Sequence, residues 1–155
     1  MKILIKMTVA VFFCSLTFSL FAGQFKAGVA KVDITPQMPT PLAGYGARES
    51  AISTGVMDHI YSRVLVISDG EKKVALVSND ILLILADLKQ EVEKNVSDLN
   101  LDGIMLTATH THSGPGGYTD IWIVKIAVMG NYVPEYRKFL LDQISKAIRE
   151  AAQNT

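Results

Sequence analysis

Two of the three histidines in the chain lie two residues apart, within residues 107–118, which read TATHTHSGPGGY. In an extended stretch, side chains two residues apart project to the same side, so one metal ion or one substrate can meet both imidazole rings. Histidine nitrogen is a common zinc ligand. His110 and His112 are therefore the first candidates for chemistry in this sequence.

Glycines surround Pro115 in the same segment, at Gly114, Gly116 and Gly117. Glycine lets the backbone come close to a ligand, and consecutive amides can face an oxyanion or another anionic group. Such donors suit acyl-transfer chemistry. On spacing alone, however, a polar turn at a strand end is slightly favoured over a functional site.

The elements that position this segment follow from the hydrophobic pattern. Residues 103–108 (GIMLTA) predict a short buried strand directly before the histidines, where α/β folds place their ligand-binding loops. Residues 61–68 and 74–83 are β-branched runs joined by a turn that begins with Asp-Gly, which predicts a hairpin. Residues 85–99 carry apolar side chains at three-to-four spacing, which predicts an amphipathic helix.

The two ends of the chain supply further elements. Residues 25–35 alternate in the manner of a strand, which Pro36 ends before a long loop rich in proline and glycine. A helix is predicted to begin near Pro134 and to run past Ile148 with one apolar stripe. Strand, helix and strand in that order imply a right-handed crossover with parallel pairing. The predicted fold class is α/β, a mixed sheet with a β-hairpin and a βαβ crossover and with helices packed on the sheet.

Length and charge narrow the function classes. The 155 residues suit one domain. Lys and Arg number 15, and so do Asp and Glu, so no charge excess draws the chain to nucleic acid. We expect no nucleic-acid partner.

Residues 1–22 read as a signal peptide. Lys2 and Lys6 give a positive start, an apolar stretch follows as far as Leu20, and cleavage after Ala22 fits the sequence. A retained membrane anchor is disfavoured, because the apolar run is shorter than the roughly 20 residues that a spanning helix needs. We therefore expect residues 23–155 to be exported, and to be periplasmic or secreted.

Cys14 is the only cysteine and lies within this predicted signal peptide. Phe13 precedes it, where a lipid-attachment site would need a small residue. The mature chain would then have no disulfide and no thiolate ligand, so any metal must be held by histidine and oxygen.

The string ATHTHSGPGGY resembles the signature of the neutral, non-lysosomal ceramidase family and is too long to agree by chance. The stretches GVAKVDIT, PLAGYGAR, IYSRVLVI and VALVSNDI resemble further segments of that family, so the resemblance extends over residues 23–155. It implies the N-terminal part of an α/β catalytic domain. In that family the domain hydrolyses the amide bond of ceramide and holds one zinc through two histidines, a glutamate and a tyrosine.

Carried over residue by residue, the resemblance makes His110 the metal ligand and His112 a catalytic residue beside the substrate. The implied cofactor is Zn²⁺, which activates water for attack on an amide carbonyl, while His112 orients the substrate or stabilises the oxyanion. Asp33 is then a candidate substrate-binding residue, in contact with a hydroxyl or amine. A turn at Thr35-Pro36 explains Asp33 equally well.

Other residues are weaker candidates for the functional site. Asp80 is expected to cap a strand end, the lone His59 to be structural or solvated, and Tyr118 to pack beneath the histidine loop. The apolar run at residues 122–128 fits contact with a membrane surface. A buried helix is the commoner explanation of such a run.

The family's second zinc histidine, its glutamate and its tyrosine have no match in this sequence. We therefore expect the rest of the catalytic domain C-terminal to Thr155. Catalytic zinc needs three protein ligands, so these residues alone are expected to be inactive. The expected partner is ceramide or a similar lipid amide. Two alternatives stay open: an exported zinc hydrolase of another amide or ester, and a non-catalytic exported binding domain.

Overall fold

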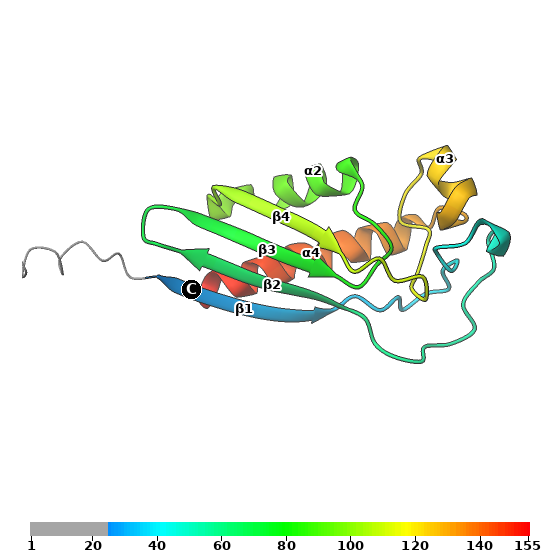
Figure 1. Cartoon of the computed structure of the whole chain (residues 1–155), viewed down its shortest axis with the longest axis horizontal. Helices are drawn as coiled ribbons and strands as arrows, with labels where there is room; N and C mark the ends of the chain where they lie inside the picture. The colour runs from blue at the N-terminus through cyan, green and yellow to red at the C-terminus, as the bar shows by residue number, and fades with distance from the viewer. Residues whose placement is uncertain (1–24) are drawn as a thin grey trace, which may run out of the picture.

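The computed structural model describes residues 25–155, so the predicted signal peptide and Cys14 lie outside the described residues. One mixed sheet of four strands in the order β1-β2-β3-β4 forms the centre of the fold (Figure 1). The first two pairings are antiparallel and the third is parallel, which confirms the predicted hairpin and crossover. The strands are β1 Lys26–Asp33, β2 Tyr61–Ser68, β3 Lys73–Asn79 and β4 Gly103–Ala108.

The hairpin between β2 and β3 forms at the predicted Asp-Gly turn. The Asp69 carboxylate accepts hydrogen bonds from the amides of Glu71 and Lys72, and Gly70 has a φ of 95°, which glycine adopts without strain. Strand β3 is shorter than the predicted 74–83, because the chain leaves the sheet after Asn79.

Asp80 fixes the point at which the chain leaves the sheet, as the sequence predicted. Its Oδ2 accepts a hydrogen bond from the Tyr61 amide at 3.0 Å and one from Arg63 Nη1 at 2.7 Å. Its backbone amide donates to the Tyr61 carbonyl. The residues after Asp80 are thereby turned away from β2 and toward the end of β4.

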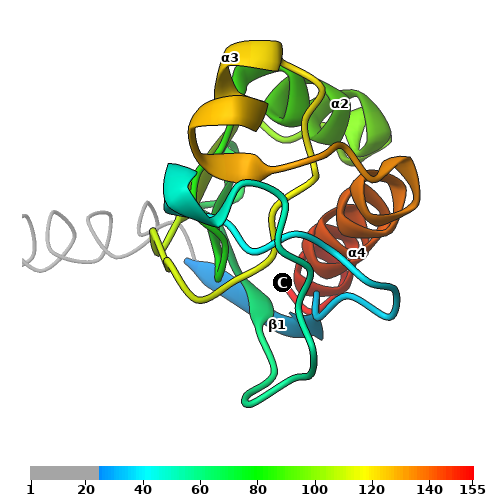
Figure 2. The same cartoon turned by 90° about the vertical axis from the view of Figure 1, so that its right-hand side faces the viewer.

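Two helices cover one face of the sheet, and the view in Figure 2 shows them side by side. Helix α2, Ala86–Asn95, is the crossover between β3 and β4 and is followed by a short 3₁₀ turn, Ser97–Leu99. Helix α4, Pro134–Gln153, packs on β1 and β2 and also contacts α2. Leu140, Ile144 and Ile148 of α4 are fully buried, so most of the predicted stripe is the core face. Strand residues Val64, Val66, Ala75 and Val77 meet them from the sheet.

A buried cation ties the two helices to the histidine loop. Arg137 on α4 is 6% exposed, and its Nη2 lies 2.8 Å from Glu91 and 3.2 Å from Asp87, both on α2. Its Nη1 donates to the Tyr118 carbonyl at 2.9 Å. The two carboxylates are 42% and 48% exposed, so solvent screens their attraction to Arg137, and either one alone still compensates its charge.

The opposite face of the sheet carries exposed apolar side chains. Val29 on β1 is 66% exposed and Met105 on β4 is 61% exposed, with Leu76 between them at 40%. Strand β4 is therefore a half-exposed edge strand, and the sequence prediction of a buried strand was wrong. It failed because an apolar run does not show whether the sheet is covered on one face or on both.

Within residues 25–155, helices of the length and apolarity that a membrane span requires do not occur.

The open sheet face makes a prediction about self-association. Replacing Val29 and Met105 together by threonine should lower light scattering at equal protein concentration, because exposed apolar patches drive association. The free energy of unfolding should change by less than about 0.5 kcal/mol for each exposed site, since threonine suits strands. The matched control is Val66→Thr, which is fully buried and should lower stability by about 1–3 kcal/mol. Scattering that stays unchanged in the double variant would contradict this assignment.

Candidate active site

His110 is held by the chain that follows β3. Its amide donates to the Ile81 carbonyl at 3.1 Å, and its Nδ1 lies 2.8 Å from the Leu82 carbonyl oxygen. A carbonyl only accepts, so Nδ1 carries the proton and, in the neutral ring, Nε2 keeps its lone pair. This is the arrangement by which proteins orient a metal-binding histidine.

His112 lies against His110. The two Nε2 atoms are 3.2 Å apart and the ring centroids 4.8 Å apart. Because the neutral His110 ring has its proton on Nδ1, the hydrogen bond between them runs from Nε2–H of His112 to Nε2 of His110. Nδ1 of His112 is buried without a hydrogen-bond partner.

The rings meet for a different reason than the sequence suggested. His110 has a φ of 61°, a left-handed conformation that is uncommon for residues other than glycine. The chain is therefore not extended at this point, and strand alternation does not explain the pairing. Such a backbone conformation costs free energy, persists only where surrounding contacts impose it, and is found disproportionately at functional sites.

The PLAGYGAR loop packs on His112 from the other side. Gly44 has a φ of 106°, and a Cβ added there would lie 2.7 Å from the His112 ring. The rings of Tyr45 and His112 meet edge to face at 4.8 Å. Arg48 Nη1 donates to the carbonyls of Ala43 and His112 at 2.5 and 2.6 Å, and its guanidinium lies over the Tyr45 ring. Arg48 thus joins the two loops.

Two of the amides expected to face an anionic group, those of Gly116 and Gly117, bind other backbone segments instead. The Gly116 amide donates to the Pro41 carbonyl at 2.7 Å, and the Gly117 amide donates to the Met129 carbonyl at 2.8 Å. A Cβ on Gly116 would lie 2.1 Å from the Met129 oxygen. The prediction that these amides face an oxyanion was wrong, because the glycines allow close approach of other backbone segments instead.

Tyr118 packs beneath the loop, as expected, and is fully buried. Its hydroxyl donates to the Leu83 carbonyl at 3.0 Å and accepts from the Leu83 amide at 3.2 Å. Burial raises the pKa of Tyr118 well above its ordinary value, so the phenol stays protonated and keeps donating. Tyr118 thereby steadies the segment whose Leu82 carbonyl holds His110.

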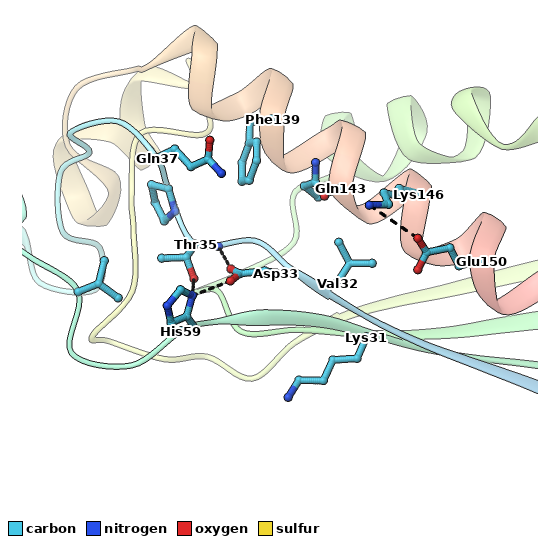
Figure 3. A pocket seen from close by; sticks show the side chains of 12 residues that line it. Lys31, Val32, Asp33, Thr35, Gln37, His59, Phe139, Gln143, Lys146 and Glu150 are labelled. Atoms are coloured by element: carbon cyan, nitrogen blue, oxygen red, sulfur yellow. Dashed lines mark hydrogen bonds and ion pairs between the residues drawn. The ribbon is translucent and has the colours of Figure 1, made fainter.

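Asp33 lies in a different cleft from the histidine pair. It ends β1, which is separated from β4 by two strands, or by about 14 Å at the usual spacing between strands. Its cleft has a volume of about 540 Å³ and lies between the end of β1, the loop at residues 35–37 and α4 (Figure 3). The structure therefore brings His110 and His112 together and leaves Asp33 apart from them.

In this cleft Asp33 pairs with His59. Its Oδ1 accepts from the Thr35 amide at 2.8 Å, and its Oδ2 lies 2.5 Å from His59 Nδ1 (Figure 3). Partial burial acts to raise the pKa of Asp33, but hydrogen bonds from Thr35 and His59 outweigh it and hold that pKa below 3.8. The pair joins the two ends of the long loop. The sequence did not indicate Asp33 as the partner of His59, because only the β1–β2 register brings residue 59 beside residue 33.

The residues present fit part of a metal site. His110 offers an oriented nitrogen, with His112 beside it, yet the described part of the chain holds no cluster of three or more His, Cys, Asp or Glu side chains placed to bind an ion. A catalytic zinc takes three protein ligands. The described residues therefore supply at most part of a three-ligand zinc site.

Fold and site together define the class: an α/β domain with a histidine pair beyond the carboxyl ends of two parallel strands. The chain belongs to the neutral/alkaline non-lysosomal ceramidase family, whose N-terminal model matches residues 25–155. This confirms the resemblance seen in the sequence.

The relatives show how much of such a protein this chain covers. It is 28% identical over 142 residues to the neutral ceramidase of Drosophila melanogaster, which covers 87% of this chain and 20% of that protein. It is 29% identical over 138 residues to the neutral ceramidase of Pseudomonas aeruginosa, with 82% and 20% covered. The crystal structure of neutral ceramidase from Pseudomonas aeruginosa superposes with a TM-score of 0.73 at 24% identity, over 84% of this chain and 22% of that one. The chain thus spans about a fifth of the length of these relatives, and the structural match shows the shared fold.

Gly44 provides a test of the contact between the two loops. Gly44→Ala should lower the free energy of unfolding by at least about 1–2 kcal/mol, because alanine disfavours a positive φ and its Cβ would meet the His112 ring. Gly55→Ala is the matched control in the same loop, since a Cβ there has nothing within 4 Å. Denaturant unfolding of both variants gives the comparison. Equal effects would show that Gly44 does not pack on His112 as described.

The Asp33–His59 pair makes a prediction about pH. A carboxyl whose pKa is lowered by folding stabilises the protein above its unfolded pKa, and this contribution is lost as the pH falls through the folded value. The Asp33 contribution is therefore complete at neutral pH and lost below about pH 3.8. In an NMR titration, His59→Gln should raise the pKa of Asp33. The lowered pKa of Asp69, set by the amides of Lys72 and Glu71, should stay unchanged as an internal control. An unmoved Asp33 pKa would exclude the pairing in solution.

Proposed function

We propose that this chain is the N-terminal part of the catalytic domain of a zinc-dependent amidohydrolase that cleaves the N-acyl amide bond of ceramide to fatty acid and sphingosine. The observation that carries the proposal is the hydrogen bond from His110 Nδ1 to the Leu82 carbonyl. It leaves Nε2 available as a metal ligand at a fixed position. Membership of the neutral/alkaline non-lysosomal ceramidase family supports the substrate class.

When bound, zinc would supply Lewis-acid activation of water and of the amide carbonyl. The contribution of His112 follows from its proton. Nε2–H of His112 donates to His110 Nε2 in the structure. If His110 Nε2 held a metal, its lone pair would no longer accept this bond, and Nε2–H of His112 could donate a hydrogen bond to the substrate oxygen, where negative charge develops.

The loop at residues 43–48 would hold this donor in place. The Tyr45 ring and Gly44 contact the His112 ring, and Arg48 binds the His112 carbonyl. Preorganised donors stabilise a transition state because they need not reorient during the reaction. Rigid packing around His112 therefore favours a catalytic role over a solvated one.

Asp33 remains a candidate substrate-binding residue in the proposal, although it lies in a different cleft from the histidine pair. A second cleft of about 280 Å³, lined by Thr35, Val56, Thr111 and Gly114 among others, lies between the histidine loop and the Asp33 cleft and shares Thr35 with the latter. A hydroxyl or amine could reach Asp33 only in a substrate that extends along this path. The half-exposed Asp33 carboxylate keeps room for such a contact.

The proposal includes export through residues 1–22 to the periplasm or medium, and completion of the zinc site by a segment C-terminal to Thr155. Two observations support the second part: the chain spans about a fifth of its relatives, and residues 25–155 hold no cluster of three metal ligands. The same observations suit a non-catalytic binding domain. A zinc hydrolase of another amide or ester is the third possibility.

The experiment is fatty-acid release from ceramide by the protein that the complete gene encodes. We expect activity that a chelator removes and zinc restores, and a loss of at least about a hundredfold in His110→Ala, because a metal ligand is removed. His112→Ala should lose about ten- to a thousandfold in kcat, as expected for a lost oxyanion donor.

The comparison variant is His59→Ala, a histidine outside the histidine pair, which should keep most of kcat, while a change in KM would report on its partner Asp33. Activity of His110→Ala equal to that of the unaltered protein would refute the metal role. Cleavage of other amides or esters with no release from ceramide would favour a zinc hydrolase of another substrate. Metal-independent ligand binding with no hydrolysis of any substrate would favour the non-catalytic binding domain.

A further inference from the structure

Four large apolar side chains stand exposed on one short helical segment. We call Ile121, Trp122, Ile123 and Ile126 the tryptophan knob, and their exposed fractions are 40%, 68%, 52% and 63%. The segment consists of α3, Trp122–Val124, continued by a π-helical turn, Lys125–Met129. The prediction of a buried helix is therefore wrong for the outer side of this segment.

The inner side of the same segment anchors the knob. Met129 is fully buried, and Val124 and Val128 pack against the core. The Gly117 amide donates a hydrogen bond to the Met129 carbonyl, and the Gly130 amide donates one to the Lys125 carbonyl. These two bonds hold the segment in place. The exposed side chains are thus presented on a fixed support and not on a free loop.

The knob adjoins the histidine pair. The Gly44 amide donates to the Val128 carbonyl at 2.8 Å, and a Cβ on Gly46 would lie 2.8 Å from the Ala127 carbonyl oxygen. Between these two glycines lies Tyr45, which is 55% exposed and contacts the His112 ring. Helix α3 lies at the end of the molecule toward which β3 and β4 point (Figure 1). The segment that carries the knob therefore packs directly against the loop that carries Tyr45, whose ring contacts His112.

The charge of the knob selects one kind of partner. Lys125 is the single charged residue from position 121 to position 129, and its Nζ forms an ion pair with Asp120 at 2.8 Å. The knob thus offers no net charge to an anionic or cationic surface. Tryptophan prefers the boundary between lipid headgroups and acyl chains, and isoleucine prefers the acyl side of it.

We propose that the tryptophan knob docks into the headgroup boundary of an uncharged, zwitterionic lipid surface and so places the histidine pair against the lipid. The proposal deepens the proposed function and rests on it for the reason why a lipid amide would be met there. Attachment follows from burial of apolar side chains and not from attraction between charges.

Trp122 is the only tryptophan of the chain, so its fluorescence reports the knob alone. On mixing the chain with phosphatidylcholine vesicles, we expect the emission to shift to shorter wavelength and to be quenched by lipids brominated in the acyl chains. Adding phosphatidylserine should not strengthen binding. Raising the salt from about 0.1 M to about 1 M, which shortens the screening length from about 10 Å to about 3 Å, should not weaken it.

Two variants with matched chemistry locate the contact. Ile123→Ser with Ile126→Ser keeps Trp122 and should lower partition into the vesicles by on the order of tenfold or more for each isoleucine. Val29→Ser with Met105→Ser removes equally exposed side chains from the outer sheet face and should leave both emission and partition unchanged.

Three results would overturn the proposal. Sedimentation with vesicles without a change in Trp122 emission would place the contact elsewhere, including in residues 1–22. An emission shift that grows with protein concentration in the absence of lipid would make the partner a second copy of the chain. Binding that requires phosphatidylserine and disappears in salt would make it electrostatic. The assay involves no catalysis, so its failure is separate from a failure of the complete protein to release fatty acid from detergent-dispersed ceramide.

Discussion

The parallel pairing of β3 with β4 is the constraint on which the site depends. The register aligns Val74 with Gly103 and Asn79 with Ala108, so both strands end at one edge of the sheet. The chain after β3 and the chain after β4 therefore leave the sheet side by side. This is why the carbonyls of Ile81 and Leu82 lie where they bind the amide and the ring of His110. Helix α2 makes the pairing possible, because parallel strands need a crossover connection.

Backbone-to-backbone packing around the histidine loop turns this edge into a rigid site. Gly116 and Gly117 admit the backbone at Pro41 and Met129, and Arg48 ties the PLAGYGAR loop to the His112 carbonyl. These contacts hold His110 in a left-handed conformation that an isolated chain would seldom adopt. The same contacts fix the tryptophan knob against the loop that carries Tyr45. The histidine pair, the aromatic ring beside it and the exposed apolar surface are therefore parts of one rigid arrangement.

Family membership and the open surfaces of the chain give a consistent description. The chain matches the N-terminal model of the neutral/alkaline non-lysosomal ceramidase family over residues 25–155 and spans about a fifth of the relatives' length. Its sheet is covered by helices on one face and carries exposed Val29 and Met105 on the other. The His110 ring is held by the Leu82 carbonyl, and the described residues contain no cluster of three His, Cys, Asp or Glu side chains placed to bind an ion.

The sequence by itself determined the elements and the position of the histidine loop. Strand alternation, the Asp-Gly turn, the helix stripe and the string ATHTHSGPGGY are local patterns, so the hairpin, the crossover and the histidine loop were predicted correctly. Only the tertiary structure decided which groups the loop residues meet. It paired Asp33 with His59 across 26 residues, used the glycine amides for other backbone segments, and left Trp122 exposed. The physical reason is that these features depend on strand order, on a left-handed residue and on what lies opposite an apolar side chain, none of which is encoded in local periodicity.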